Sequence, residues 1–396
     1  MNLVVSCEYG LESIVIEELN EFGYHGEQIV PSRILISNAT ESDIYHLNIA
    51  VRTIHRVFVL LGDFNCTSMD EIIQAARSVD YSFWMDDSQT FGIRGLREGS
   101  QDFGSMDIAR EVGTVVVEYF KTKTGRRIQV NLDDPDVEIM AHLSGDRLLL
   151  LIATSSQSIH RRIERPYQHF ASLKPSIAAA LLRKSSWKSY KSVLDPMAGS
   201  GVIPIDAAMQ ARQMASGLFA NHEMFRFNRL QFLNYENFLN ILELYKAKAL
   251  PSSDIDIRSA DRYEKSVAGM QQNISQFGLD DGIRIHQGDA ENLNYISKGE
   301  ISCIVTNPPY GMRIANPGVV KALYKNFARA CAEKEINEIV AVTPRRHHWI
   351  VSFTSQGYKL NFLQRFYFGR LNVFMLRLVV GGNDNKETTD FSRVTP

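Results

Sequence analysis

The 396-residue sequence has few cysteines and no apolar run long enough to span a bilayer. Its cysteines show neither CxxC spacing nor a disulfide pattern, which disfavours structural zinc and favours a reducing cytoplasm. They are Cys7, Cys66, Cys303 and Cys331. Residues 1–10 lead straight into a strand-like stretch and lack the basic start and apolar core of a signal peptide. We therefore expect a cytoplasmic protein without a membrane segment or a bound metal.

The chain also lacks a strong net charge. Its 43 lysines and arginines oppose 45 acidic residues, and the net charge of −2 says nothing by itself about a nucleic-acid partner. Because a binding face needs only a local patch of cations, two basic clusters matter more than the total. The first consists of Lys121, Lys123, Arg126 and Arg127, and the second of His160, Arg161, Arg162 and Arg165. Each is either a solvated face or a surface that positions RNA.

Two kinds of pattern divide the chain. Residues 1–60 and 61–158 have the mixed strand and helix periodicities of two small α+β units. From residue 175 to 382, strand-like runs alternate with helical stretches, which predicts βαβ units and a mostly parallel sheet. Residues 159–174 form a linker, and the polar residues 383–396 have a composition typical of disorder. The predicted fold class is α/β, a Rossmann-like domain preceded by an α+β module.

A glycine-rich turn follows the strand predicted at residues 192–195. A strand that ends in an acid, then a tight turn and a helix, lets a nucleoside approach the carboxyl ends of the strands. No GK[ST] follows to hold phosphates, and the spacing does not fit the dinucleotide pattern GxGxxG. An ordinary strand-to-helix turn is the alternative. The candidate cofactor-binding residues here are Asp195, Pro196, Ala198, Gly199, Ser200 and Gly201.

Two further acids follow later strands. Asp261 comes directly after the strand predicted at residues 256–260, where a carboxylate commonly accepts hydrogen bonds from ribose hydroxyls. Asp289 and Ala290 follow the strand predicted at 283–287, and the Asp289 carboxylate is a candidate acceptor for an adenine amino group. Competing acids near the first position are Asp254, Asp256 and Glu264.

The most informative motif is Asn307-Pro308-Pro309-Tyr310, at the end of the strand predicted at residues 301–306. An amine conjugated to a ring is a poor nucleophile because its lone pair is delocalised. The Asn307 side-chain oxygen and a backbone carbonyl, for which we favour that of Pro308, can accept both amine hydrogens and so orient the nitrogen lone pair. The prolines stiffen the loop, and Tyr310 offers a face on which an extruded base can stack. We predict these four residues to be catalytic, with Asn307 also at the cofactor.

With those motifs, the chain resembles a class I methyltransferase of the N2-guanine/N6-adenine type, which implies S-adenosylmethionine as cofactor and a mostly parallel seven-stranded sheet. Upstream, the segments 109–110, 124–127, 131–136 and 160–162 resemble the THUMP domain of RNA-modifying enzymes, and residues 171–182 resemble the segment that precedes the first cofactor motif. The family is that of the THUMP-containing guanine-N2 RNA methyltransferases. The resemblance implies a ferredoxin-like unit at 1–60, a THUMP domain at 61–158, and RNA contacts by Lys121, Lys123, Arg126, Arg127, Arg161, Arg162 and Arg165.

The choice of RNA rests on one feature of the chain. A long insert that includes residues 219–250 separates Asp195 from Asp261 and resembles the bacterial 23S rRNA enzymes, so rRNA is favoured and tRNA is the alternative. Two departures from the family pattern are Ile163-Glu164-Arg165 in the linker and Ala198 in the turn. Adenine-N6 nucleic-acid enzymes and glutamine-N5 protein enzymes share the tetrapeptide, but their usual accessory domains differ from this N-terminal half. A non-catalytic RNA-binding or assembly factor is the remaining alternative.

Overall fold

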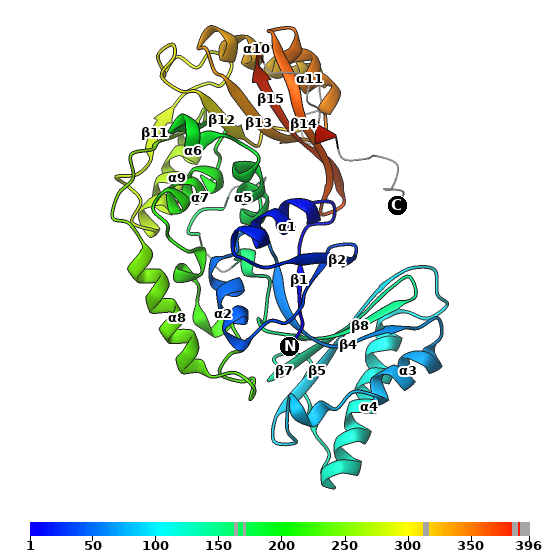
Figure 1. Cartoon of the computed structure of the whole chain (residues 1–396). Helices are drawn as coiled ribbons and strands as arrows, with labels where there is room; N and C mark the ends of the chain where they lie inside the picture. Colours follow the sequence, from blue (N-terminus) through cyan, green and yellow to red (C-terminus); the bar gives the residue numbers. More distant parts are fainter. Residues whose placement is uncertain (162–164, 169–171, 312–316, 382–386, 389–396) are drawn as a thin grey trace. The chain divides into compact units, whose positions relative to one another are not determined.

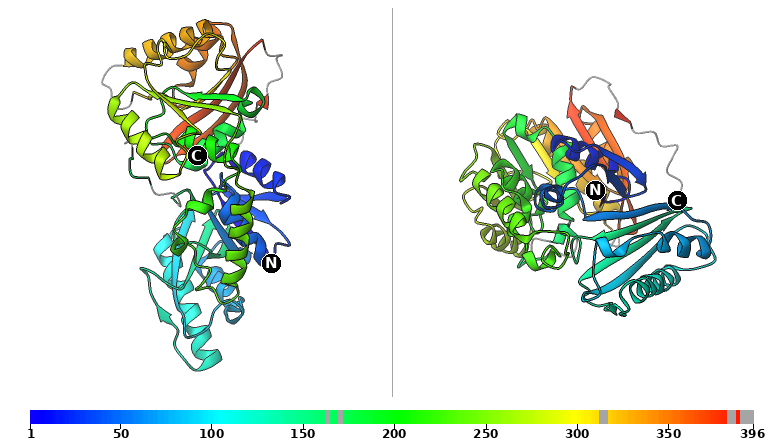
Figure 2. Two further views of the ribbon diagram at one scale, coloured as in Figure 1. Left: turned by 90° about the vertical axis from the view of Figure 1, so that its left-hand side faces the viewer. Right: turned by 60° about the horizontal axis from the view of Figure 1, so that its bottom comes forward.

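The computed structural model describes residues 1–161, 165–168, 172–311, 317–381 and 387–388. The chain divides into two compact units (Figures 1 and 2). Unit 1 consists of Met1–Cys7, Val15–Ile163 and Ser216–Ala247, and unit 2 of Glu8–Ile14, Glu164–Ala215 and Lys248–Pro396. Within the described ranges, no helix has the length and apolar character that crossing a membrane requires.

Unit 1 is built on one eight-stranded sheet with the order β2-β3-β1-β4-β8-β7-β5-β6. β5 pairs in parallel with β6 and β7, and the other neighbouring strands pair antiparallel. The strands are β1 (Leu3–Ser6), β2 (Gly26–Val30), β3 (Arg33–Ile36), β4 (Arg56–Asn65), β5 (Thr90–Glu98), β6 (Gln129–Val130), β7 (Val137–Ser144) and β8 (Arg147–Ala153). The boundary predicted after residue 60 falls inside β4, which pairs with β1 on one side and β8 on the other.

Residues 1–128, all of them described, contain four α-helices: α1 (Glu12–Glu21), α2 (Glu41–Ala50), α3 (Met69–Arg77) and α4 (Ser105–Thr124). α3 begins with a capping box, in which the Ser68 hydroxyl accepts a hydrogen bond from the Glu71 amide and the Glu71 carboxylate accepts one from the Ser68 amide. α4 ends at Gly125, whose φ of 75° is the left-handed conformation that favours glycine. Both ends are therefore specified by local sequence.

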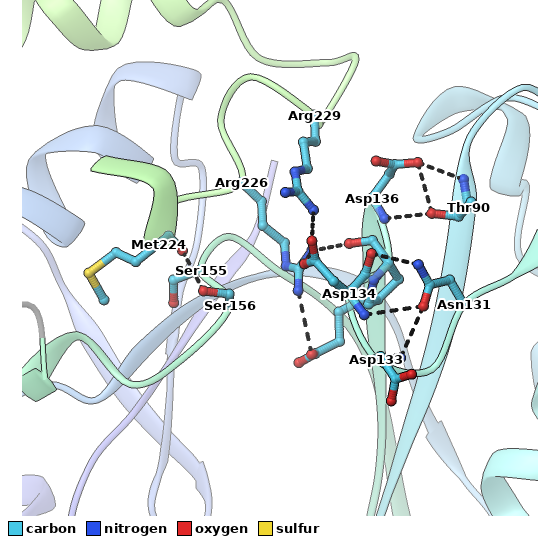
Figure 3. Close-up of polar contacts among 12 residues, drawn as sticks. Thr90, Asn131, Asp133, Asp134, Asp136, Ser155, Ser156, Met224, Arg226 and Arg229 are labelled. Carbon is cyan, nitrogen blue, oxygen red and sulfur yellow. Dashed lines mark hydrogen bonds and ion pairs between the residues drawn. The ribbon is translucent and has the colours of Figure 1, made fainter. Parts of the chain in front are cut away.

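The insert belongs to unit 1, although it lies between two elements of unit 2 in the sequence. It contains two 3-10 turns, Ser216–Phe219 and His222–Met224, and helix α8 (Tyr235–Lys248). Its Phe225 forms an isolated bridge with Ser155, and the Ser156 amide donates to the Met224 carbonyl at 2.7 Å (Figure 3). Phe227 and Phe238 are fully buried. The insert is thus an integral part of this unit's core.

Charged contacts fix the insert to the loop before β7 (Figure 3). The Arg226 guanidinium, 3% exposed, donates to the Pro135 carbonyl and lies 3.6 Å from Asp134 and 3.9 Å from Glu138. Arg229 pairs with Asp134 at 2.9 Å but is 35% exposed. Two neighbouring arginines therefore bind one loop, the first buried and the second largely solvated.

Unit 2 contains the second sheet, with the order β11-β10-β9-β12-β13-β15-β14-β16. Strands β9 to β13 are parallel neighbours, as the alternating pattern predicts, and β15 and β14 close the sheet antiparallel. The strands are β9 (Ser192–Asp195), β10 (Asp256–Asp261), β11 (Arg284–Gln287), β12 (Cys303–Thr306), β13 (Glu338–Thr343), β14 (Tyr358–Phe368), β15 (Leu371–Val380) and β16 (Glu387–Thr388). The order reverses between β9 and β12, which is where open α/β sheets bind ligands.

The seven-stranded sheet is extended by the short β16, which pairs with β14 in a region predicted to be disordered. The rest of that predicted tail, 383–386 and 389–396, lies outside the described residues. The helices of this unit are α5 (Pro175–Arg183), α6 (Trp187–Tyr190), α7 (Val202–Ala211), α9 (Glu264–Gln276), α10 (Pro317–Glu333) and α11 (Arg346–Thr354). Leu194 of β9, Ile304 of β12 and Trp349 of α11 belong to one buried hydrophobic cluster, which packs against both strands.

Candidate active site

The glycine-rich turn after β9 is tied to the neighbouring strand β10. The Ala198 amide donates to the Ala260 carbonyl at 2.9 Å, and the Gly199 amide donates to the Asp261 carboxylate at 3.0 Å. Gly201 has a φ of 78°, and a Cβ there would lie 2.8 Å from the Met270 side chain. The turn therefore requires glycine at this position, both for its backbone conformation and for space.

Asp195 is the last residue of β9 and directly precedes the turn, with 3% of its surface exposed. Its carboxylate accepts hydrogen bonds from the Thr306 hydroxyl at 2.7 Å and from the Met197 amide at 3.2 Å. Thr306 directly precedes Asn307, so Asp195 joins the end of β9 to the start of the asparagine loop. Burial raises the pKa of Asp195 to about 7, and the nearby Asp261 acts in the same direction.

This shifted pKa predicts an unusual dependence of stability on pH. The Asp195 carboxyl has an ordinary pKa of 3.8 and a pKa of about 7 in the folded protein, so between these values the folded state binds more protons. Stability then falls as pH rises from about 4 to 7. Asp195→Asn keeps an oxygen for Thr306 and Met197 but cannot ionise. We expect its urea midpoint to depend less on pH across this window than the wild-type midpoint, and parallel dependences would contradict the assignment.

The other two predicted acids occupy neighbouring strand ends. Asp261 accepts from the Gly199 amide and also from the Tyr263 amide at 3.0 Å, so it braces the turn that is predicted to bind the cofactor. Asp289 lines an open pocket of about 420 Å³ with Arg262, from which it lies 3.5 Å away. The Ala290 side chain is buried in the core, which leaves only its backbone for a cofactor contact.

The asparagine loop is held by hydrogen bonds to its backbone. The Tyr324 hydroxyl donates to the Pro309 carbonyl at 3.1 Å, and the Arg345 guanidinium donates to the Tyr310 carbonyl at 2.7 Å. Among the described residues, no hydrogen bond reaches the carbonyl of Pro308, which stands between Asn307 and Pro309 in the sequence. The two predicted acceptors, the Asn307 amide oxygen and the Pro308 carbonyl, thus come from adjacent residues. The next two carbonyls of the loop already accept hydrogen bonds within the protein.

Tyr310 makes a contact that its predicted stacking role did not include. Its hydroxyl donates to the Asn307 side-chain oxygen at 2.6 Å. Burial raises the pKa of Tyr310, so the phenol stays protonated and remains a donor. The bond fixes the oxygen of Asn307 as the acceptor, and the second lone pair of that oxygen can still receive a substrate hydrogen. Stacking of a base on this ring stays a prediction.

Tyr295 is a site residue that the sequence did not reveal. Its hydroxyl is buried and has no hydrogen-bond partner among the described residues. Burial raises the pKa of Tyr295, and the nearby carboxylates of Asp195, Asp289 and Asp261 act in the same direction. Its ring packs on Gly288, where a Cβ would lie only 2.1 Å away. A buried, unpartnered hydroxyl among these acids fits the edge of a ligand, because such groups are rarely left unsatisfied. No motif marks it, since only the fold brings it to the acids.

The basic residues predicted to bind RNA fall into different environments. Lys121, Arg126, Arg127 and Arg161 are exposed, as is Lys123, which bonds to Asp80, Ser82 and Tyr119. Arg165 is instead partly buried and donates to the hydroxyls of Ser172 and Ser200. Arg162 lies outside the described residues. Within the described part of the chain, no three histidines, cysteines or acids are placed to hold a metal ion.

Comparison with known proteins places these features in a family. Residues 162–360 match the model of an RMKL-like methyltransferase domain, residues 66–153 that of a THUMP domain, and residues 2–58 that of an RlmL ferredoxin-like domain. A tRNA (guanine(6)-N2)-methyltransferase of Archaeoglobus fulgidus is 36% identical over 81% of this chain and 77% of its own. The ribosomal RNA large subunit methyltransferase K/L of Vibrio parahaemolyticus is 26% identical over 80% of this chain, which spans only 45% of that protein.

The solved structure of SMU.472 in complex with SAH has the same fold, with a TM-score of 0.84 over 96% of this chain and 98% of that chain, at 22% identity. Fold and site together define a class I methyltransferase that uses S-adenosylmethionine. The chain belongs to the RMKL-like methyltransferase family and carries that family's methyltransferase domain behind a THUMP domain. The resemblance found in the sequence is confirmed.

Proposed function

We propose that the enzyme methylates the exocyclic N2 of a guanine in RNA. The observation that carries this proposal is the loop after β12, in which the Asn307 oxygen is oriented by Tyr310 and the neighbouring Pro308 carbonyl accepts no other hydrogen bond from a described residue. Two acceptors at one loop suit the two hydrogens of an amino group. Guanine rather than adenine rests on the family, whose curated relatives include guanine-N2 enzymes.

The chain's contribution to the reaction is orientation and electrostatics. Bound S-adenosylmethionine supplies a methyl group activated by its sulfonium. Asp261 would hold the ribose and Asp289 the adenine amino group, and the turn from Pro196 to Gly201 would line the same ligand. Asn307 and Pro308 would accept the amine hydrogens, so that the nitrogen lone pair points toward the methyl carbon. Arg345 and Tyr324 keep the loop in place through its carbonyl oxygens.

Of the RNA classes, we place tRNA first and rRNA second. The rRNA preference rested on the long insert, and the match of residues 2–58 to an RlmL ferredoxin-like domain supports it. The tRNA alternative is favoured by relatives that match most of both chains at 36% and 32% identity. The rRNA relatives are 26% identical, and this chain spans less than half of their length. Exposed cations of unit 1 would bind the RNA backbone while the pocket selects the base.

A labelling experiment tests this proposal. Total RNA from cells that lack the gene is incubated with the enzyme and labelled S-adenosylmethionine, then separated by size and digested to nucleosides. We expect N2-methylguanosine in the tRNA fraction. Label in the rRNA fraction would exchange the order of the two RNA classes, whereas label in N6-methyladenosine would refute the guanine assignment.

The RNA-binding face is tested separately with a double variant, Lys121→Ala with Arg127→Ala. Each side chain is exposed and lies near the end of α4. If both contact phosphates, RNA affinity falls and the slope of log K against log salt decreases by roughly 1 to 2, because each phosphate contact contributes about 0.7 to 0.9. Binding of S-adenosylhomocysteine should not change. An unaltered salt slope would show that this cluster is a solvated face.

A further inference from the structure

A segment of unit 2 that precedes α5 reaches the cofactor turn. Nη1 of Arg165 lies 3.2 Å from the Ser172 hydroxyl and 3.4 Å from the Ser200 hydroxyl, and the two hydroxyls are 3.0 Å apart. Ser200 stands between the two glycines of the turn and is 2% exposed. The guanidinium that the sequence assigned to RNA therefore lies at the cofactor site.

Contacts with helix α9 fix the position of this segment. Asn273 of α9 is fully buried and bonds both backbone groups of Tyr167, at 3.0 Å and 2.9 Å. The same Asn273 amide donates to the Ser200 carbonyl at 2.8 Å. The Tyr167 ring packs on Gly269, where a Cβ would lie 2.2 Å from it. One buried side chain thus holds both the segment and the turn, and Arg165 is placed between them.

Arg165 places a positive charge beside the hydroxyls of Ser172 and Ser200. Across the described residues, no carboxylate pairs with it, and burial alone acts on its pKa, which it lowers. Other shielded arginines of this unit do have acidic partners: Arg212 lies 2.6 Å from Asp281 and Arg258 lies 2.7 Å from Asp256. A partly desolvated cation that contacts only hydroxyls is a ready site for an anion.

We propose that Arg165 binds the carboxylate of the amino-acid end of the methyl donor. That carboxylate is the only anionic group of S-adenosylmethionine. The rest of the site carries the carboxylates of Asp261 and Asp289, which suit hydroxyl, amino and sulfonium groups but repel another carboxylate. Arg165 supplies the complementary charge beside Ser200. The inference concerns the cofactor and does not depend on which RNA is methylated.

Binding of two ligands to Arg165→Met tests this assignment. One ligand is S-adenosylhomocysteine, and the other is its analogue that lacks only the carboxylate. We expect calorimetry to show a roughly 10- to 100-fold loss of affinity for the first, as removal of a charge-assisted hydrogen bond would produce, and little change for the second. Arg165→Lys should restore part of the affinity. Arg161→Met, which removes an exposed cation of the same basic cluster, is the matched control and should bind both ligands as the wild type does.

Each other outcome overturns the proposal. An equal loss for both ligands would mean that Arg165 only supports the turn through Ser172 and Ser200. Unchanged affinity for S-adenosylhomocysteine with weakened RNA binding would mean that Arg165 contacts RNA and not the cofactor. Because these are binding measurements, they remain informative even if the proposed RNA substrate is wrong.

Discussion

Replacing Asn307 by alanine is expected to lower the rate of methyl transfer by about 10²- to 10³-fold, the range found when one preorganised hydrogen-bonding group is removed from an active site. The affinity for S-adenosylmethionine should change little, because the turn after β9 and the acids Asp195 and Asp261 remain. The variant loses the oxygen that Tyr310 orients at 2.6 Å and that we propose as an acceptor for the amine. Single-turnover transfer and calorimetric binding of the cofactor separate the two effects.

Two companion variants sharpen that experiment. Tyr310→Phe removes only the hydroxyl that donates to Asn307, so it should slow transfer less than the loss of Asn307 itself. Thr306→Ser keeps the hydroxyl that binds Asp195 at 2.7 Å and serves as a control for disturbance next to the loop. A rate for Asn307→Ala within tenfold of the wild type would show that Asn307 is not a catalytic residue. A large loss of cofactor affinity would instead give it a structural role.

Local order along the chain made much of unit 2 predictable. The runs predicted at residues 192–195, 256–260 and 301–306 correspond to β9, β10 and β12, because alternating strands and helices have strong periodicities. Each predicted cofactor acid stands at or just after a strand end, and parallel strands bring their carboxyl ends to one edge. Sequence order was therefore enough to place Asp195, Asp261 and Asn307 at the same edge of the sheet, where the parallel strands end.

Contacts that depend on tertiary packing were not predictable. The bond between Asp195 and Thr306 joins residues 111 positions apart, and the Arg165 contact with Ser200 spans 35. The sequence of a basic cluster does not show that one of its members is buried, because a buried and an exposed arginine carry the same charge. Tyr295 likewise carries no motif. The continuous sheet of unit 1 arises from pairing of β4 with β8, which local sequence did not distinguish from two separate α+β units.

The insert is the clearest case of long-range structure without a local signal, and Arg226 explains how it is fixed. This side chain is 3% exposed and reaches Glu138, which is 5% exposed, while its guanidinium also donates to the Pro135 carbonyl (Figure 3). Its backbone amide donates to the Thr154 carbonyl at 2.9 Å. Removing the Arg226 guanidinium takes away the charged donor to the Pro135 carbonyl, whereas Glu138 keeps Arg56 at 2.8 Å. Loss of one hydrogen bond to a charged group costs about 1.5–3 kcal/mol.

Arg226→Met is therefore expected to destabilise unit 1 by about 1.5–3 kcal/mol, although the apolar part of the side chain is kept. Arg229→Met is the matched control: it removes a neighbouring arginine with the same partner, Asp134, but one that is 35% exposed, and surface pairs contribute only about 0–1 kcal/mol. Hydrogen exchange at the amides of Ser156 and Arg226 reports directly on docking of the insert. In Arg226→Met these amides should exchange roughly 10- to 100-fold faster, following the same free energy through local opening, with little change in Arg229→Met. Equal exchange in the two variants would mean that aromatic packing alone, around Phe227 and Phe238, holds the insert in place.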